Sequence, residues 1–201
     1  MKNILIFGAS RAGKTSLAKR IKDEFQFNVV NIDHLINTFE QAFPHLGISG
    51  EKDYLQTTVN VTPFTTHYLC ELAQHANCKT GSKFVVDATF FDFDTGIPLM
   101  KDTLQKFGGL KLLDEFMFIG LDNNKTSEEL FNDVRKYDTP GDWSYNISDD
   151  ELRNHCDGNT GLDEAFYEKW KELGLRRYDV AKGREQIFDT IVEDLKVILI
   201  K

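Results

Sequence analysis

Apolar residues follow two patterns along the chain: short continuous runs, and stretches in which they recur every three or four positions. Continuous runs are typical of strands buried on both faces, and they predict strands at residues 3–7, 27–32, 84–86 and 116–121. A short fifth strand is predicted at residues 175–178. Helical spacing predicts helices at residues 13–25, 127–137, 163–173 and 185–199. Pro63 is expected to begin a further helix, because proline suits the first helical turn, and residues 51–61 show another helical pattern.

Strands and helices alternate, which predicts an α/β fold with a mostly parallel sheet and helices on both of its faces. In such a sheet the carboxyl ends of the strands, and the loops that follow them, lie along one edge. This edge is expected to hold the glycine-bounded loop after the first strand, Asp33 after the second and Asp87 after the third. Residues 136–162, rich in Gly, Asp, Asn and Ser, predict a lid at the same edge, with a short helix near 148–155.

The composition indicates one compact domain over residues 1–201. With 41% hydrophobic and 28% charged residues, the chain is similar to ordinary globular proteins, and its length suits one core. The net charge of −8 argues against a nucleic-acid partner, whose phosphates require basic residues. No run approaches the roughly 18 apolar residues of a membrane span, and three scattered cysteines indicate reduced thiols in a cytoplasmic protein. The sequence is compatible with either a monomer or a homodimer.

The loop after the first strand carries the most specific motif of the chain. Between a predicted strand and a predicted helix, the phosphate-binding pattern GxxxxGK[ST] is matched by Gly8-Ala9-Ser10-Arg11-Ala12-Gly13-Lys14-Thr15. Glycines let successive N–H groups turn inward, and the helix start, which includes Ser16, adds its positive dipole end. Lys14 is expected to reach the β- and γ-phosphates of a nucleoside triphosphate, and the Thr15 hydroxyl to bind Mg²⁺. The alternative is a glycine-rich turn that binds nothing.

Two carboxylates follow predicted strands at the same edge as this Walker A loop. Asp87 ends the run Phe84-Val85-Val86, as in a Walker B strand, where an acidic residue holds Mg²⁺ directly or through a water. Asp87 could instead cap the turn that follows it. Asp33 ends the second predicted strand, and it is either a functional carboxylate or an ordinary helix N-cap.

Four segments together resemble the P-loop kinases that include adenylate, uridine and shikimate kinases: ILIFGASRAGKTSLAKRI, VVNIDHL, FVVDATF and RRYDVAKGREQIFDTIV. The resemblance implies a three-layer fold with a sheet in the order 2-3-1-4-5, and an enzyme that uses ATP and Mg²⁺ to phosphorylate an acceptor. It also implies that Asp33 receives the proton of the attacking hydroxyl, and that Arg135, or else Arg153, stabilises the transferring phosphoryl group. Arg184 falls where such kinases contact the adenine. The first two arginines could instead pair with acidic neighbours on the surface, and Arg184 could merely begin the last helix.

The acceptor is expected to lie against residues 33–80. No arginine occurs between Asp33 and Val134, whereas nucleoside monophosphate kinases resemble one another in gripping the acceptor phosphate with arginines from this region. This favours a small hydroxyl-bearing acceptor that is not a phosphomonoester. Core packing is the common role of phenylalanine. Aromatic residues and histidines of this region could instead stack on, or hydrogen-bond to, a neutral ring of the acceptor: His34, Phe39, Phe43, His45, Tyr54 and Phe64. A nucleotide kinase, a regulatory NTPase and a nucleotide-binding module without turnover stay as alternatives.

Overall fold

The fold is seen in a computed structural model, which describes residues 2–8, 11–48, 54–75, 81–87, 93–107, 114–142, 144–157, 168, 171 and 174–199. Within these ranges, only the backbone is described for residues 54–57, 75, 93–97 and 107. A single parallel sheet in the order β2-β3-β1-β4-β5 is built from β1 (Asn3–Gly8), β2 (Asn28–Asn31), β3 (Phe84–Asp87), β4 (Phe116–Asp122) and β5 (Arg176–Asp179). The predicted strand positions and sheet order are confirmed.

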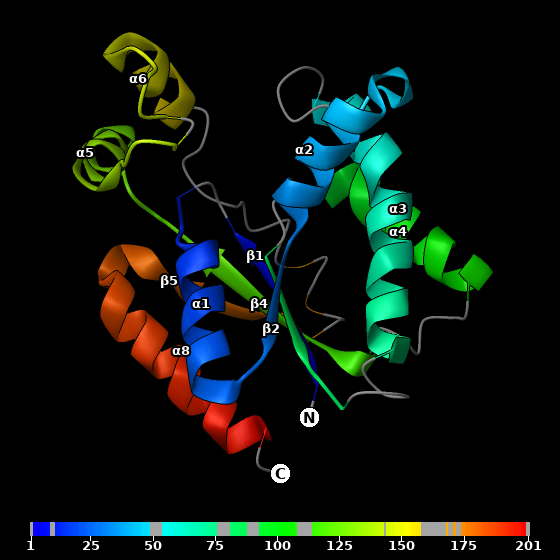
Figure 1. Cartoon of the computed structure of the whole chain (residues 1–201). Coiled ribbons are helices and arrows are strands. Elements are labelled where there is room, and N and C mark those ends of the chain that lie inside the picture. Colours follow the sequence, from blue (N-terminus) through cyan, green and yellow to red (C-terminus); the bar gives the residue numbers. More distant parts are fainter. Residues whose placement is uncertain are drawn as a thin grey trace.

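Helices cover both faces of this sheet and extend beyond its carboxyl edge (Figure 1). One face carries α1 (Lys14–Phe25) and α8 (Arg184–Leu199), and the other carries α3 (Tyr54–His75) and α4 (Phe93–Phe107). Beyond the edge lie α2 (Ile32–Ala42) on one side, and α5 (Ser127–Tyr137) with α6 (Asp149–Asp157) on the other. Two 3₁₀ turns, η1 (Pro44–Leu46) and η4 (Val180–Lys182), complete the described elements.

The central strand β1 explains why the protein has an apolar layer on each side of the sheet. Successive side chains of a strand point to opposite faces. Ile4 and Ile6 therefore pack with α1 and α8, while Leu5 and Phe7 pack with α3, α4 and α2. All four side chains are at most 1% exposed, and burial of each contributes about 1.5–3 kcal/mol. The continuous apolar run thus fixes the strand at the centre of three layers.

The helices between β2 and β4 differ from the sequence prediction. Pro63 does not begin a helix, because α3 runs unbroken from Tyr54 to His75 with Pro63 inside it. Buried side chains on both sides of the proline, among them Thr58, Val61, Thr62 and Leu69, hold this helix against its neighbours despite the missing backbone donor. Helix α4 was not predicted, since Gly96 and Pro98 interrupt its apolar spacing. The helix predicted at 163–173 lies almost wholly outside the described residues.

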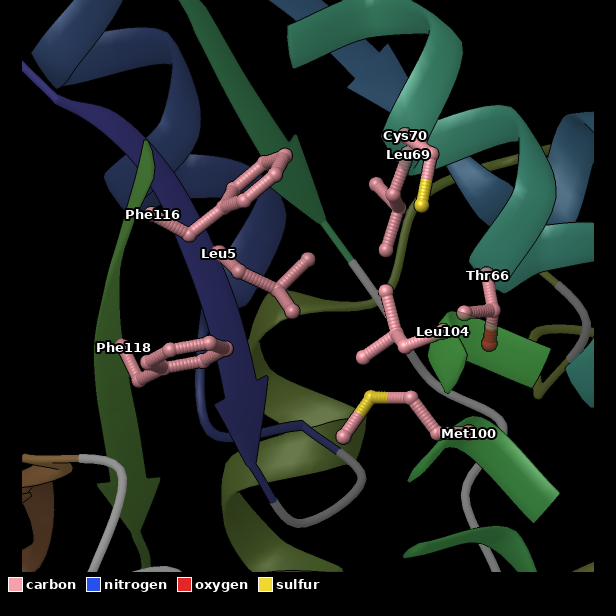
Figure 2. A pocket seen from close by; sticks show the side chains of 8 residues that line it. All are labelled: Leu5, Thr66, Leu69, Cys70, Met100, Leu104, Phe116 and Phe118. Atoms are coloured by element: carbon pink, nitrogen blue, oxygen red, sulfur yellow. The ribbon is translucent and has the colours of Figure 1, made fainter. Parts of the chain in front are cut away.

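A small apolar cavity lies between the sheet and the α3–α4 pair (Figure 2). The side chains that line it come from β1, β4, α3 and α4: Leu5, Thr66, Leu69, Cys70, Met100, Leu104, Phe116 and Phe118. The hydroxyl of Thr66 is directed to its own helix, where it donates to the Thr62 carbonyl at 2.7 Å. The cavity therefore belongs to the core and offers no polar group to a ligand.

None of the helices that the structure describes combines the length and the apolar character that a membrane span requires.

Candidate active site

The phosphate loop joins β1 to α1 at the carboxyl edge of the sheet, as the motif requires. Gly8 lies so close to β4 that a Cβ there would come within 2.6 Å of the Leu121 carbonyl oxygen, which only glycine avoids. Gly13 has a φ of 88° and immediately precedes α1. Of the predicted loop residues, Ala9 and Ser10 lie outside the described residues, while Ala12 is fully buried and Ser16 is exposed on α1.

The Lys14 side chain is folded back over this loop. It is 7% exposed, and its Nζ donates to the Gly8 carbonyl oxygen at 3.1 Å. Burial lowers the pKa of Lys14, because the charged form loses hydration, whereas the neighbouring carboxylates of Asp87 and Asp33 act in the opposite direction. The lysine of the motif is thus influenced by both carboxylates, Asp87 at the end of β3 and Asp33 in the first turn of α2.

Asp87, the last residue of β3, connects the loop to the neighbouring strand. Its Oδ2 accepts a hydrogen bond from the Thr15 hydroxyl at 2.5 Å and one from the Asn31 side-chain amide at 3.2 Å. Parallel register explains the second contact, since Asn31 of β2 is paired with Asp87. Burial raises the pKa of Asp87, and the Thr15 hydrogen bond and the Lys14 charge partly offset this effect.

The arrangement around Asp87 fits a magnesium ion that has few protein ligands. Its second oxygen, Oδ1, is buried and has no hydrogen-bond partner among the described residues. Carboxylate and hydroxyl oxygens are the ligands that Mg²⁺ prefers, and this ion usually keeps several waters and substrate phosphate oxygens. In the described part of the chain, no cluster of three or more His, Cys, Asp or Glu residues could form an all-protein cage. Thr15 and Asp87 therefore suit a metal that is shared with a phosphate ligand.

Asp33 lies in the first turn of α2 and does not cap it. The N-cap is Asn31, whose side-chain oxygen accepts from the His34 backbone N–H at 3.3 Å. Asn31 thus ends β2, begins α2 and bonds to Asp87. Sequence reasoning missed this residue, although an asparagine directly before an amphipathic helix is a capping signal. The capping alternative for Asp33 is wrong, and its role as a proton acceptor stays a prediction.

Arg135, predicted to face the transferring phosphoryl group, is bonded within the lid region in this structure. Its guanidinium donates to the carbonyl oxygens of Ser144 at 2.9 Å and Ile147 at 2.8 Å, and to Asp149 Oδ1 at 2.9 Å. The alternative arginine, Arg153, forms an ion pair with Glu128, and its guanidinium lies 3.8 Å from the centre of the Phe131 ring. A direct role for either arginine in phosphoryl transfer stays a prediction, and would require these contacts to be exchanged.

Two further arginines make contacts at the phosphate loop: Arg11 within it and Arg184 at the start of α8. Arg184 donates to the Arg11 carbonyl oxygen at 3.0 Å, and its guanidinium lies 5.8 Å from the Tyr137 ring centre. The Arg11 side chain donates to Oδ1 of Asp138, the residue that follows α5, at 3.0 Å. Sequence reasoning found both arginines but missed Asp138, because residues 127 positions apart leave no local signal of their pairing.

Some of the predicted acceptor residues form an aromatic cluster on α2, η1 and α3. The Phe39 ring centre lies 4.5 Å from that of Phe64 and 5.9 Å from that of Phe43, and His45 contacts Phe43. Phe43 is 46% exposed and Phe64 is 36% exposed, so neither residue is buried in the core. The side chain of Tyr54 lies outside the described residues.

The strand order, the GxxxxGKT loop and the Thr15–Asp87 contact together define a protein with the P-loop kinase fold. The chain belongs to the Zeta toxin family, whose model matches residues 2–108. No curated protein matches the sequence.

Three solved structures share the whole fold at low sequence identity. A sugar kinase from Janibacter sp. HTCC2649 is 14% identical with a TM-score of 0.56, over 98% of this chain and 95% of that one. A shikimate kinase from Bacteroides thetaiotaomicron is 16% identical with a TM-score of 0.54, over 100% and 99%. A gluconokinase from Sinorhizobium meliloti 1021 is 16% identical with a TM-score of 0.52, over 98% and 96%. The resemblance to P-loop kinases is confirmed at the level of the fold.

Proposed function

We propose that this protein is an ATP- and Mg²⁺-dependent phosphotransferase that moves the γ-phosphoryl group to a small hydroxyl-bearing acceptor. The observation that carries the proposal is the 2.5 Å contact between the Thr15 hydroxyl and Asp87, beside the buried Lys14. These side chains come from the loop after β1 and the end of β3, where a P-loop protein holds nucleotide and metal. When bound there, Mg²⁺ would supply positive charge to the phosphate oxygens and fix their orientation.

The residues of the loop have distinct roles in this proposal. Lys14 would exchange its bond to the Gly8 carbonyl for the β- and γ-phosphate oxygens. Thr15 and Asp87 would hold the metal, and the Asn31 amide keeps the Asp87 carboxylate oriented. Arg184, between the loop and Tyr137, would support the nucleotide side of the site.

Asp33 is the residue we assign to the acceptor. Its negative charge acts against the lowering of the Lys14 pKa, and Lys14 is the residue proposed to reach the β- and γ-phosphates. There its carboxylate would orient the acceptor hydroxyl and take up its proton as that oxygen attacks the γ-phosphorus. Arg135 would contribute by holding the lid in shape or, after rearrangement, by contacting the phosphoryl group.

The acceptor is proposed to be a hydroxyl-bearing compound that is not a phosphomonoester. The region from Asp33 to Val134 contains no arginine that could bind an acceptor phosphate. The exposed ring of Phe43 directly follows α2, and that of Phe64 lies on α3. The similar structures, a sugar kinase, a gluconokinase and a shikimate kinase, support an acceptor rich in hydroxyl groups.

The proposal is tested by ADP formation from MgATP with nucleosides, sugars, polyols, cofactor precursors and nucleoside monophosphates, beside a control without acceptor. We expect a hydroxyl compound without a phosphate group to raise ADP formation above this control. Lys14→Ala should lower that rate more than ~100-fold. Failure of every acceptor to exceed the control would refute the kinase assignment.

Asp33 is tested by Asp33→Asn, with Asp23→Asn on the exposed end of α1 as the matched control. Loss of the proton acceptor should reduce transfer at least ~100-fold and leave the affinity for MgATP within about twofold. The control should behave as the wild type in both measurements. An equal loss of transfer and of ATP affinity in Asp33→Asn would remove Asp33 from this role.

A further inference from the structure

Helices α5 and α6, with the segment between them, form a separate packing unit of the described structure, and residues 126–157 are called the lid from here on. Its apolar cluster consists of side chains from α5, α6 and the segment between them: Leu130, Phe131, Val134, Ile147, Leu152 and Cys156. The two larger clusters on the faces of the sheet contain none of these residues. Contacts of another kind must therefore hold this unit, residues 126–157, beside the phosphate loop.

A buried carboxylate provides such a contact. Asp138 is the residue directly after α5, and its side chain is only 3% exposed. Its Oδ1 accepts from Arg11 Nη2 at 3.0 Å and from the Ser144 hydroxyl at 2.6 Å, while its Oδ2 lies 3.6 Å from Arg135 Nη1. One carboxylate thus joins the arginine of the phosphate loop to the arginine that bonds the lid carbonyls.

The loop side of this contact is tightly constrained. Arg11 has a φ of 62°, a left-handed conformation that is uncommon for a residue with a side chain. Its carbonyl oxygen accepts from Arg184 at the start of α8, and its guanidinium also approaches Asp142 at 3.8 Å. Such a backbone conformation persists where surrounding contacts fix it. Arg11 is therefore held at both its backbone and its side chain.

We propose that Asp138 is a positioning residue that sets Arg11 of the phosphate loop and anchors the lid to the nucleotide site. This inference rests on the proposed function. Asp138 contacts Arg11, and a triphosphate bound in the loop would also lie near this residue; because both are negative, they would compete for its guanidinium. The lid is anchored when the carboxylate holds Arg11 and is released for movement when phosphate oxygens take its place. One arginine thereby couples occupancy of the loop to the position of α5 and α6.

The proposal predicts that two variants change the affinity for nucleotide in opposite directions. Asp138→Asn removes a negative charge beside the phosphate site, so it should tighten binding of adenylyl imidodiphosphate with Mg²⁺ by ~3–10-fold. Arg11→Gln removes a positive charge from the loop and should weaken the same binding by a similar factor. Without nucleotide, both variants should raise amide hydrogen exchange in residues 126–157 by roughly tenfold, because each breaks the anchor. Loss of packing alone would not give affinities of opposite sign.

Calorimetry with this analogue and hydrogen exchange of the nucleotide-free protein are the two measurements. Asp150→Asn, at an exposed acidic position of the same lid, is the matched control and should behave as the wild type in both. Unchanged lid exchange in Asp138→Asn and Arg11→Gln, or affinity changes of the same sign, would overturn the proposal. Should Asp138→Asn fail to fold, Arg11→Gln alone breaks the contact from the loop side, and wild-type lid exchange in it would count against the anchor. If the wild type binds no analogue, the proposed function fails, while the exchange measurement still tests the anchor.

Discussion

A single hydroxyl group, that of Thr15, joins the phosphate loop to the carboxylate at the end of β3. Thr15→Val keeps the shape of the side chain but removes this donor and metal ligand. We expect the variant to lose ~10–100-fold in affinity for adenylyl imidodiphosphate when Mg²⁺ is present, and to differ little from the wild type in EDTA. Calorimetry under both conditions measures the effect, and Thr15→Ser, which restores the hydroxyl, is the control. An equal loss with and without metal would contradict a role in metal binding.

At the scale of single residues, the sequence predicted groups that belong to a local motif and missed those defined by contacts across the fold. Gly8, Lys14 and Thr15 are fixed by the spacing of one short loop, so their positions followed from the pattern. Asn31 and Asp138 matter because register and chain path bring them to Asp87 and Arg11, respectively. Neither pairing is visible in the order of the amino acids.

Among the elements, α3 carries a proline that leaves one backbone hydrogen bond of the helix unmade. Pro63→Ala restores the N–H and removes the ring, which should stabilise the protein by about 2 kcal/mol and raise the melting midpoint by roughly 4–8 °C. The gain is reduced because alanine also makes the unfolded chain more flexible. Pro44 is the matched control: it lies at the start of η1, where no helical donor is lost, so Pro44→Ala should give no increase. A lower midpoint for Pro63→Ala in thermal unfolding would contradict this account.

The strands were easier to predict than the helices between them. The strands β1, β3 and β4 are short runs of mainly apolar, buried residues, and a polar residue or glycine marks the carboxyl end of each. In α3 and α4 the buried positions include several threonines, such as Thr62 and Thr103, and prolines lie inside both helices. Packing of one helix on the other stabilises them, and this information is tertiary rather than local.

For the molecule as a whole, the attachment of α8 to the sheet predicts how stability changes in alkaline solution. Burial, together with the Asp194 carboxylate that accepts its hydrogen bond at 2.7 Å, raises the pKa of Tyr178 to about 12. Between pH 10 and 12 the folded protein keeps this proton while the unfolded chain loses it, so the free energy of unfolding falls as the pH rises.

Denaturant unfolding at several pH values across this range tests the prediction with Tyr178→Phe. The variant should show a smaller fall in the free energy of unfolding than the wild type, because one of the ionising groups is gone. Tyr145→Phe, at a ring that is 46% exposed, should keep the wild-type dependence. A steeper fall in Tyr178→Phe than in the wild type would refute the assignment.

The separate apolar cluster of α5 and α6 has a consequence for how such a chain diversifies. Residues 126–157 lie between β4 and β5 in the sequence, and their interior side chains pack on one another. A recombination event that replaced this segment would need only two junctions and would disturb neither large core. Descendant proteins could therefore acquire a different lid, and with it a different acceptor specificity, while they keep the same nucleotide-binding scaffold.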